Sequence, residues 1–153
     1  MIKSIVVVLV SILVISCQNE NIIYSENQEL SPEVEWIKSD IKEFVVPITE
    51  VDLTCKMFLN FRFITGYAYP NVLVKVTETS PSGKIEVFEY DLKVIDENGE
   101  YIGDPGLDIW DSQHLVETVK SYTEVGNYTY ILEQNTPVDP LNHVMEIGIV
   151  LEK

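Results

Sequence analysis

The stretch TCKMFLNFRF, residues 54–63, alternates between apolar and polar side chains more regularly than any other part of the chain. One parity carries Cys55, Met57, Leu59, Phe61 and Phe63. Successive side chains of a β-strand point to opposite faces of its sheet, so this pattern predicts a strand with one face on the core. Cys55 lies on the apolar face, and we interpret it as a buried, inert thiol rather than a nucleophile.

The same period of two recurs along the rest of the chain. It predicts further strands over residues 42–50, 71–79, 84–95, 100–103, 114–122, 127–134 and 144–152. Pro47, inside the first of these, favours an edge strand or a bulge, because proline cannot donate to a sheet ladder. SPSG (80–83) and DENG (96–99) have the composition of turns, GDPGLD (103–108) that of a loop, and PEVEW (32–36) predicts a short helix.

About eight short strands separated by turns, with no long stretch of helical period, predict an all-β fold. We expect a single β-sandwich or jelly-roll-like domain over residues 34–153. Residues 18–33 are polar and lack a sustained period, so they are interpreted as a tether. Sixteen residues would reach roughly 20–25 Å as a coil and about 55 Å when extended.

The N-terminus carries the apolar run VVVLVSILVISC, residues 6–17. From Ile5 to Ile15 only Ser11 interrupts it. This run is too short to cross a bilayer, since a helical span needs roughly 20 residues. It has the length of a secretory signal, with Lys3 as the positive charge in front.

The end of that run, Val14-Ile15-Ser16-Cys17, resembles a bacterial lipobox. The resemblance implies a lipoprotein signal peptide over residues 1–16, removed before Cys17, and fatty acyl chains such as palmitate on Cys17. Residues 17–33 would then be the lipidated cysteine and its tether, and the lipid would hold the protein on a membrane. The alternative is a plain signal peptide followed by an incidental cysteine.

The chain has 25 acidic and 10 basic residues, a net charge of −15. Such a surface argues against binding nucleic acid or anionic lipid head groups. It suits a solvated envelope protein, a cationic partner or divalent cations. If Cys17 is acylated, Cys55 has no partner for a disulfide. The two histidines, His114 and His143, lie far from either cysteine, so no zinc pattern is present.

No enzyme signature is found. The chain lacks Gly-x-Ser-x-Gly, His-Glu-x-x-His, a phosphate loop and a dinucleotide fingerprint. We therefore expect a non-enzymatic protein without a cofactor.

The loop GDPGLDIWD, residues 103–111, is one candidate site. Asp104, Asp108 and Asp111 are carboxylates of the kind that a hard cation such as calcium needs, although the spacing is not that of an EF-hand. A solvated loop whose aspartates stabilise turns is the interpretation we favour. Trp110, between two of the aspartates, is a candidate for contact with a partner.

Arg62, the only arginine in the chain, is the second candidate. It lies on the outward parity of its strand, and GYAYPN follows, with Tyr67 and Tyr69. A planar cation near exposed aromatic rings is a good anchor for a partner protein or a sugar. The alternative is a structural ion pair with one of the many carboxylates.

Five stretches together resemble the gliding-motility lipoprotein GldH family of Bacteroidota: PEVEW to Pro47, NFRFITGYAYPNVLV, SPSGKIEVFEYDL, IGDPGLDIWD and VMEIGIVLEK. The matching positions upstream are Trp36, Asp40, Phe44, Pro47, Asn60, Arg62, Tyr67, Tyr69 and Asn71. Those downstream are Gly103, Gly106, Asp108, Ile109, Asp111, Glu146, Gly148 and Glu152. Two arginines typical of the family are missing, since Val150 occupies one position and Glu133 to Thr136 replace a Gln-x-Met-Arg. Ala68 also stands where the family has a proline, and the resemblance does not extend to a partner contact made by those two arginines.

The resemblance implies a binding or assembly role in gliding-motility machinery, or in related secretion machinery, with other envelope proteins as partners. Family members also occur in species that do not glide. The alternative function is a carbohydrate-binding or nutrient-uptake accessory lipoprotein that uses Trp110 and the tyrosines as sugar platforms. We expect a lipid-anchored location on the periplasmic face of the outer membrane, because residues 18–21 lack a strong acidic run.

Overall fold

The computed structural model describes residues 21–153, so the predicted signal peptide and Cys17 lie outside the described part. The strands are β1 (Ile22–Glu29), β2 (Glu35–Trp36), β3 (Lys42–Ile48), β4 (Leu53–Ile64), β5 (Asn71–Thr79), β6 (Ile85–Lys93), β7 (Asp104–Pro105), β8 (Ile109–Tyr122), β9 (Gly126–Gln134), β10 (Leu141–Asn142) and β11 (Val144–Glu152). Residues 21–153 contain no helix, and so none that is long and apolar enough to span a membrane.

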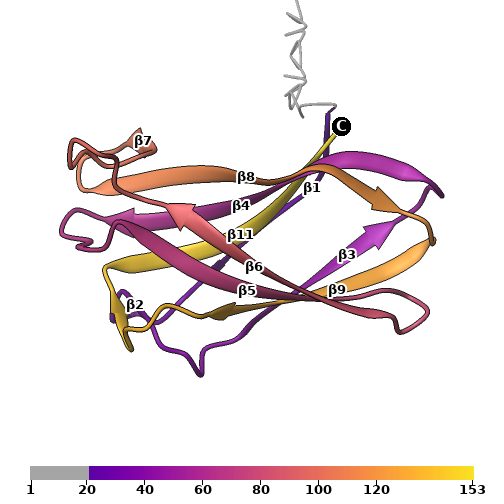
Figure 1. The fold of residues 1–153 in the computed structure, drawn as a ribbon, viewed down its shortest axis with the longest axis horizontal. Coiled ribbons are helices and arrows are strands. Elements are labelled where there is room, and N and C mark those ends of the chain that lie inside the picture. The colour runs from indigo at the N-terminus through magenta and orange to yellow at the C-terminus, as the bar shows by residue number, and fades with distance from the viewer. Residues whose placement is uncertain (1–20) are drawn as a thin grey trace, which may run out of the picture.

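Two antiparallel sheets pack face to face, which confirms the all-β sandwich (Figure 1). The first sheet has the order β1-β11-β4-β8-β7, and the second has the order β3-β9-β5-β6. The two-residue strands β2 and β10 form a separate small ladder. HLVETVKSY lies within β8 as predicted, whereas the expected strand at 100–103 is reduced to one bridge between Ile95 and Tyr101.

The core lies between the two sheets, where the predicted apolar parity of β4 is confirmed. Its inward side chains, Cys55, Met57, Leu59, Phe61 and Phe63, are at most 4 % exposed. They face buried residues of β3 and β5 such as Phe44 and Val74. Burying each large side chain contributes about 1.5–3 kcal/mol. Burial also raises the pKa of the Cys55 thiol, in agreement with an inert role.

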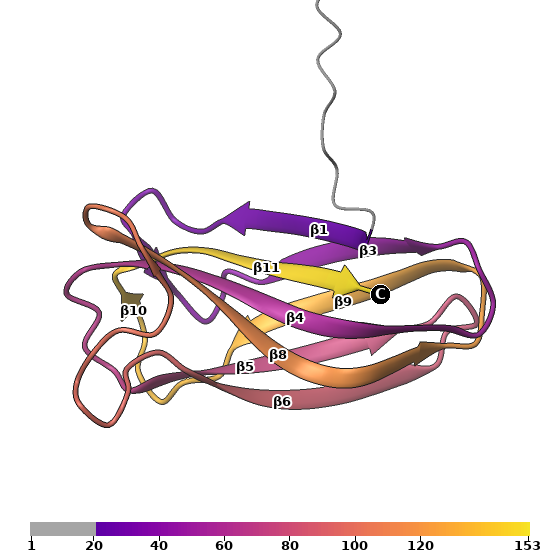
Figure 2. The same ribbon diagram turned by 90° about the horizontal axis from the view of Figure 1, so that it is seen from above.

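The two edges of the sandwich are closed by side chains rather than by strand pairing. β1 runs beside β3 at one edge, and β8 runs beside β6 at the other (Figure 2). Gln28 of β1 donates through Nε2 to the Glu43 carbonyl of β3, at 2.7 Å. At the opposite edge the Tyr90 hydroxyl of β6 donates to Glu117 Oε1 of β8, at 2.9 Å. β3 is an edge strand, so the prediction from Pro47 is confirmed.

Two predictions near the N-terminus are wrong. Ile22–Glu29, assigned to the tether, forms strand β1 and pairs with β11 from Glu152 to Glu146, so the domain begins well before residue 34. Alternate side chains of β1 face outward from the sheet, and the others lie at the edge of the sheet, where they are only partly covered. Neither set therefore has to be apolar, and the strand lacks the alternating pattern. PEVEW forms a turn and strand β2 instead of a helix, since Val34 has a φ of 58° and Trp36 pairs with Leu141.

Candidate functional site

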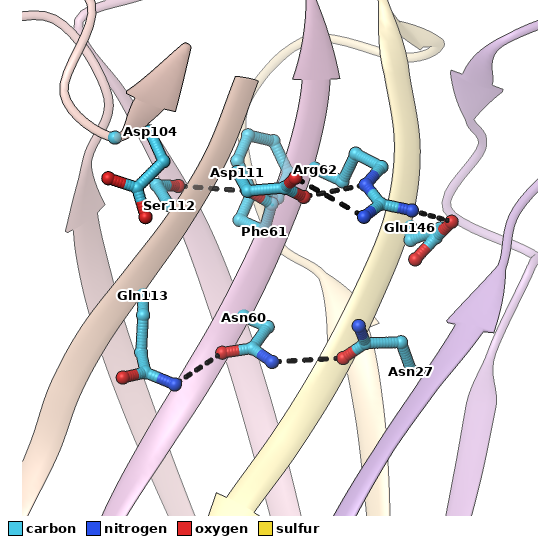
Figure 3. A pocket seen from close by; sticks show the side chains of 10 residues that line it. Asn27, Asn60, Phe61, Arg62, Asp104, Asp111, Ser112, Gln113 and Glu146 are labelled. Atoms are coloured by element: carbon cyan, nitrogen blue, oxygen red, sulfur yellow. Dashed lines mark hydrogen bonds and ion pairs between the residues drawn. The ribbon is translucent and has the colours of Figure 1, made fainter. Parts of the chain in front are cut away.

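Arg62 lies at the centre of a row of charged residues on the outer face of the first sheet. It is in register with Glu146 on β11 and with Asp111 on β8. Its Nε and Nη2 donate to the two carboxylate oxygens of Asp111, at 2.6 and 3.2 Å, and its Nη1 donates to Glu146 Oε1 at 2.6 Å. The guanidinium therefore bridges three strands (Figure 3).

This arrangement keeps Arg62 charged and holds it in one geometry. The hydrogen bonds that Arg62 donates to Asp111, together with its contact to Glu146, raise the pKa of Arg62 above its ordinary value despite partial burial. Bidentate pairing of a guanidinium with a carboxylate is stronger and more directional than a single contact. The structural ion pair considered from the sequence is thus present.

Asp104 adds a further carboxylate to the row. It is in register with Asp111 across β7 and β8. The backbone reaches this position through Gly103, which has a φ of 141° and where a Cβ atom would lie 2.6 Å from the Asp111 carbonyl oxygen. Only glycine tolerates both that conformation and that approach.

A second row, composed of amides, runs parallel to the charged one. Gln113 Nε2 donates to Asn60 Oδ1 at 3.1 Å, and Asn60 Nδ2 donates to Asn27 Oδ1 at 3.0 Å. Gly148 of β11 lies in register between Asn27 and Asn60. A Cβ atom there would be 1.9 Å from Asn27 Oδ1, so glycine leaves the space in which the two amides meet.

Together the two rows form a groove with a volume of about 470 Å³. Figure 3 shows their side chains side by side across the sheet. The lining residues are Asn27, Asn60, Phe61, Arg62, Gly103, Asp104, Asp111, Ser112, Gln113 and Glu146. They carry amides, carboxylates and one guanidinium, which suit a polar partner surface or hydroxyl groups.

Of the predicted contact residues around Arg62, the tyrosines lie elsewhere. The expectation that Tyr67 is exposed is wrong, because it is 1 % exposed and packs against Phe61 and Phe63. Its hydroxyl donates to the Asn71 carbonyl at 3.0 Å, and burial raises its pKa. Tyr69 is half-buried and packs edge-on against Tyr67.

Trp110 and Asp108 also lie outside the groove. Trp110 is half-buried, stacks on Phe63 with ring centroids 6.5 Å apart, and donates through Nε1 to Thr65 Oγ1 at 3.3 Å. Asp108 is exposed, and its carbonyl accepts a hydrogen bond from Thr65 N at 2.8 Å. Of the three aspartates considered as calcium ligands, Asp104 and Asp111 line the groove and Asp108 does not. Within residues 21–153 no three acidic, histidine or cysteine side chains are grouped so that they could hold a metal ion.

Sequence reasoning missed Asn27 and Gln113 as groove residues. Asn27 fell within the assumed tether, and Gln113 is one polar residue among many. Gly148 offered a signal, because a glycine inside a strand pattern often marks a close approach of other atoms.

Comparisons with known proteins agree with the resemblance drawn from the sequence. The family model described as GldH lipoprotein matches residues 22–151. The chain belongs to the GldH lipoprotein family. A gliding motility lipoprotein GldH homolog from Christiangramia forsetii is 24 % identical over 159 aligned residues, which cover 98 % of this chain and 95 % of that protein. Membership implies a lipid-anchored location in the cell envelope.

Among solved structures, a family GH115 4-O-methyl-alpha-glucuronidase with specificity for decorated arabinogalactans is similar to 89 % of this chain. The chain spans only 18 % of that protein, with a TM-score of 0.45 and 12 % sequence identity. We draw no functional conclusion from so distant a likeness.

Proposed function

We propose that this protein is a lipid-anchored, non-enzymatic binding component of gliding-motility or related secretion machinery, and that the groove around Arg62 contacts an envelope partner. The lipid on Cys17 restricts the domain to a membrane surface, which raises its effective concentration near partners on that membrane. We place it on the periplasmic face of the outer membrane.

The observation that carries this proposal is the convergence of separate family-matched stretches on one groove. Asn60 and Arg62 come from β4, Asp111 from β8, and Glu146 with Gly148 from β11. These residues are far apart in the sequence, yet they line or shape the same groove. Their hydrogen bonds hold the polar groups in place before any partner binds, which lowers the entropy cost of association.

The test is a crosslinking pull-down of the natively lipidated protein from its own envelope. The groove variant combines Asp104→Asn with Gln113→Ala, two exposed positions. The matched control combines Asp91→Asn, on β6 of the second sheet, with Asn135→Ala, directly after β9, and both positions are exposed. A Cys17→Ser variant removes the acylation site.

We expect motility or secretion components to be recovered with the parent protein and with the control variant. The groove variant and Cys17→Ser should lose them. Equal recovery with the groove and control variants would show that the groove is not the contact surface. Recovery of the same components with the Cys17→Ser variant would show that the lipid anchor is not needed for the contact.

The carbohydrate-binding alternative lacks the platforms on which it was based. Tyr67 is buried, and the Trp110 ring is stacked on Phe63 with its indole nitrogen already bonded. The amides and carboxylates of the groove would still suit sugar hydroxyls. A glycan screen with the parent protein and the groove variant separates the two functions, since affinity lost only in the variant would favour the sugar.

A further inference from the structure

The long strands sort the connecting segments into two opposite ends of the sandwich. The turns 49–52, 80–84 and 123–125 lie together at one end, here called the near end (Figure 1). Segments 30–41, 65–70, 94–108 and 135–143 lie at the other, called the far end. Leu53 and Ile64 mark the two ends of β4, which spans about 35 Å at the usual rise per residue.

The two ends differ strongly in charge. The far-end segments contain nine acidic side chains and one lysine. The near-end turns, with Lys153, contain three acidic side chains and two lysines. Most of the net charge of the connecting segments is therefore concentrated away from the near end.

The attachment point lies close to the near end. β1 begins at Ile22, in register with Glu152 and, through it, with Lys56, about 10 Å along β4 from Leu53. Asn21 is already joined to the domain, because its carbonyl accepts a hydrogen bond from Lys153 N at 2.8 Å. Only residues 18–20 separate Cys17 from Asn21, so the two Cα atoms are at most about 14 Å apart.

We propose that the lipidated domain stands with its near end against the bilayer and presents its acidic far end and the groove away from the lipid. This rests on the proposed acylation of Cys17. The short connection keeps the domain close to the bilayer surface. A surface with anionic lipids repels the far-end carboxylates within a Debye length of about 8–10 Å. Arg62 lies about 30 Å along β4 from Leu53, so the groove is held at that height for a partner.

The experiment compares two single-cysteine labelling sites in the natively acylated full chain, reconstituted into phosphatidylethanolamine–phosphatidylglycerol vesicles. Val51→Cys places a dye at the near end, and Leu107→Cys places it at the far end, where the native residues are 64 % and 102 % exposed. Cys55 is 4 % exposed, so the parent protein should not take up the dye. Energy transfer to an acceptor on the lipid head groups reports the height of each site.

Intact mass is measured first, because a chain without acylation would overturn both this inference and the proposed function. With acylation present, we expect several-fold more efficient transfer from position 51 than from position 107. Equal or reversed efficiencies would overturn the orientation alone.

A twelve-residue Gly-Ser insertion after Gln18 serves as the control. A flexible chain of about 16 residues has an r.m.s. reach of roughly 22 Å, which frees the domain from the surface. Both efficiencies should then fall and approach one another. An unchanged difference would show that the short connection does not set the orientation.

Discussion

Asn60 and Asn27 share a hydrogen bond across a strand to which neither belongs. Asn60 Nδ2 lies 3.0 Å from Asn27 Oδ1, and Gly148 of β11 occupies the register position between them. The side chains meet because Gly148 has none. The amide row of the groove thus depends on a missing Cβ atom as much as on the amides.

Replacing Gly148 by alanine tests this dependence. The new Cβ atom would lie 1.9 Å from Asn27 Oδ1 and 2.6 Å from the Glu26 carbonyl oxygen, so side chain and backbone must both move. We expect the free energy of unfolding to fall by about 1–3 kcal/mol, as for other overpacked sites. Urea denaturation of the Gly148→Ala protein measures the loss.

The matched control is Asn27→Ala, alone and combined with Gly148→Ala. The single change should cost about 1 kcal/mol, the usual worth of one hydrogen bond. In the double variant part of the clash is gone, so the two losses should differ from additivity by at least about 0.5 kcal/mol. Strict additivity would mean that Gly148 does not act through Asn27.

Arg62→Met removes the cation between two carboxylates. Glu146 has a side-chain exposure of 16 %, and Asp111 is in register with Asp104, so the variant leaves three carboxylates near one another. We expect a loss of about 1–3 kcal/mol in the free energy of unfolding, smaller at high salt because salt screens the repulsion.

The control for Arg62 is Lys84→Met, which breaks an ion pair with Glu86 between well-exposed side chains. Exposed pairs contribute about 0–1 kcal/mol. If the two variants lose the same stability at every salt concentration, the groove pair is no stronger than an ordinary surface pair.

Lys120→Met should lower the free energy of unfolding more than either Arg62→Met or Lys84→Met. Lys120 of β8 and Glu78 of β5 form an ion pair between the two sheets, with side-chain exposures of only 11 % and 6 %. Removing one partner leaves a buried charge and should cost about 3–5 kcal/mol. Adding Glu78→Met should restore much of the loss, whereas Lys75→Met, at the more exposed pair with Glu133, should cost far less. Thermal unfolding of the three variants ranks them.

His114 predicts a pH dependence of stability. Burial lowers the pKa of His114 below its usual value, and Ser112 Oγ lies 2.9 Å from its Nε2. The unfolded chain therefore takes up a proton at higher pH than the folded one. This group's contribution is fully present above about pH 6.5 and is lost as the pH falls through the lower, folded pKa.

Urea titrations over that window should show a shallower pH slope for His114→Gln than for the parent protein. Parallel slopes for the parent and His114→Gln would contradict the prediction.

Much of the fold could be predicted from local patterns. The alternation in β4, the edge position of Pro47 and the turns at 80–83 and 96–99 follow from residues close together in the sequence. Only part of the groove was visible in this way. Arg62 and Asp111 were candidates, but Asn27 was hidden in a polar segment without periodicity, and Tyr67 was wrongly expected at the surface.

The amino-acid sequence by itself determined most of the long strands and which of their faces are apolar, because a period of two and the burial of apolar side chains are local properties. Only the tertiary structure decided that Ile22–Glu29 adds a strand to the sheet and that Asn27, Asn60 and Gln113 meet. These residues are 33 and 53 positions apart along the chain. Their contact depends on strand order and register, which arise from the pairing and packing of the two sheets as a whole.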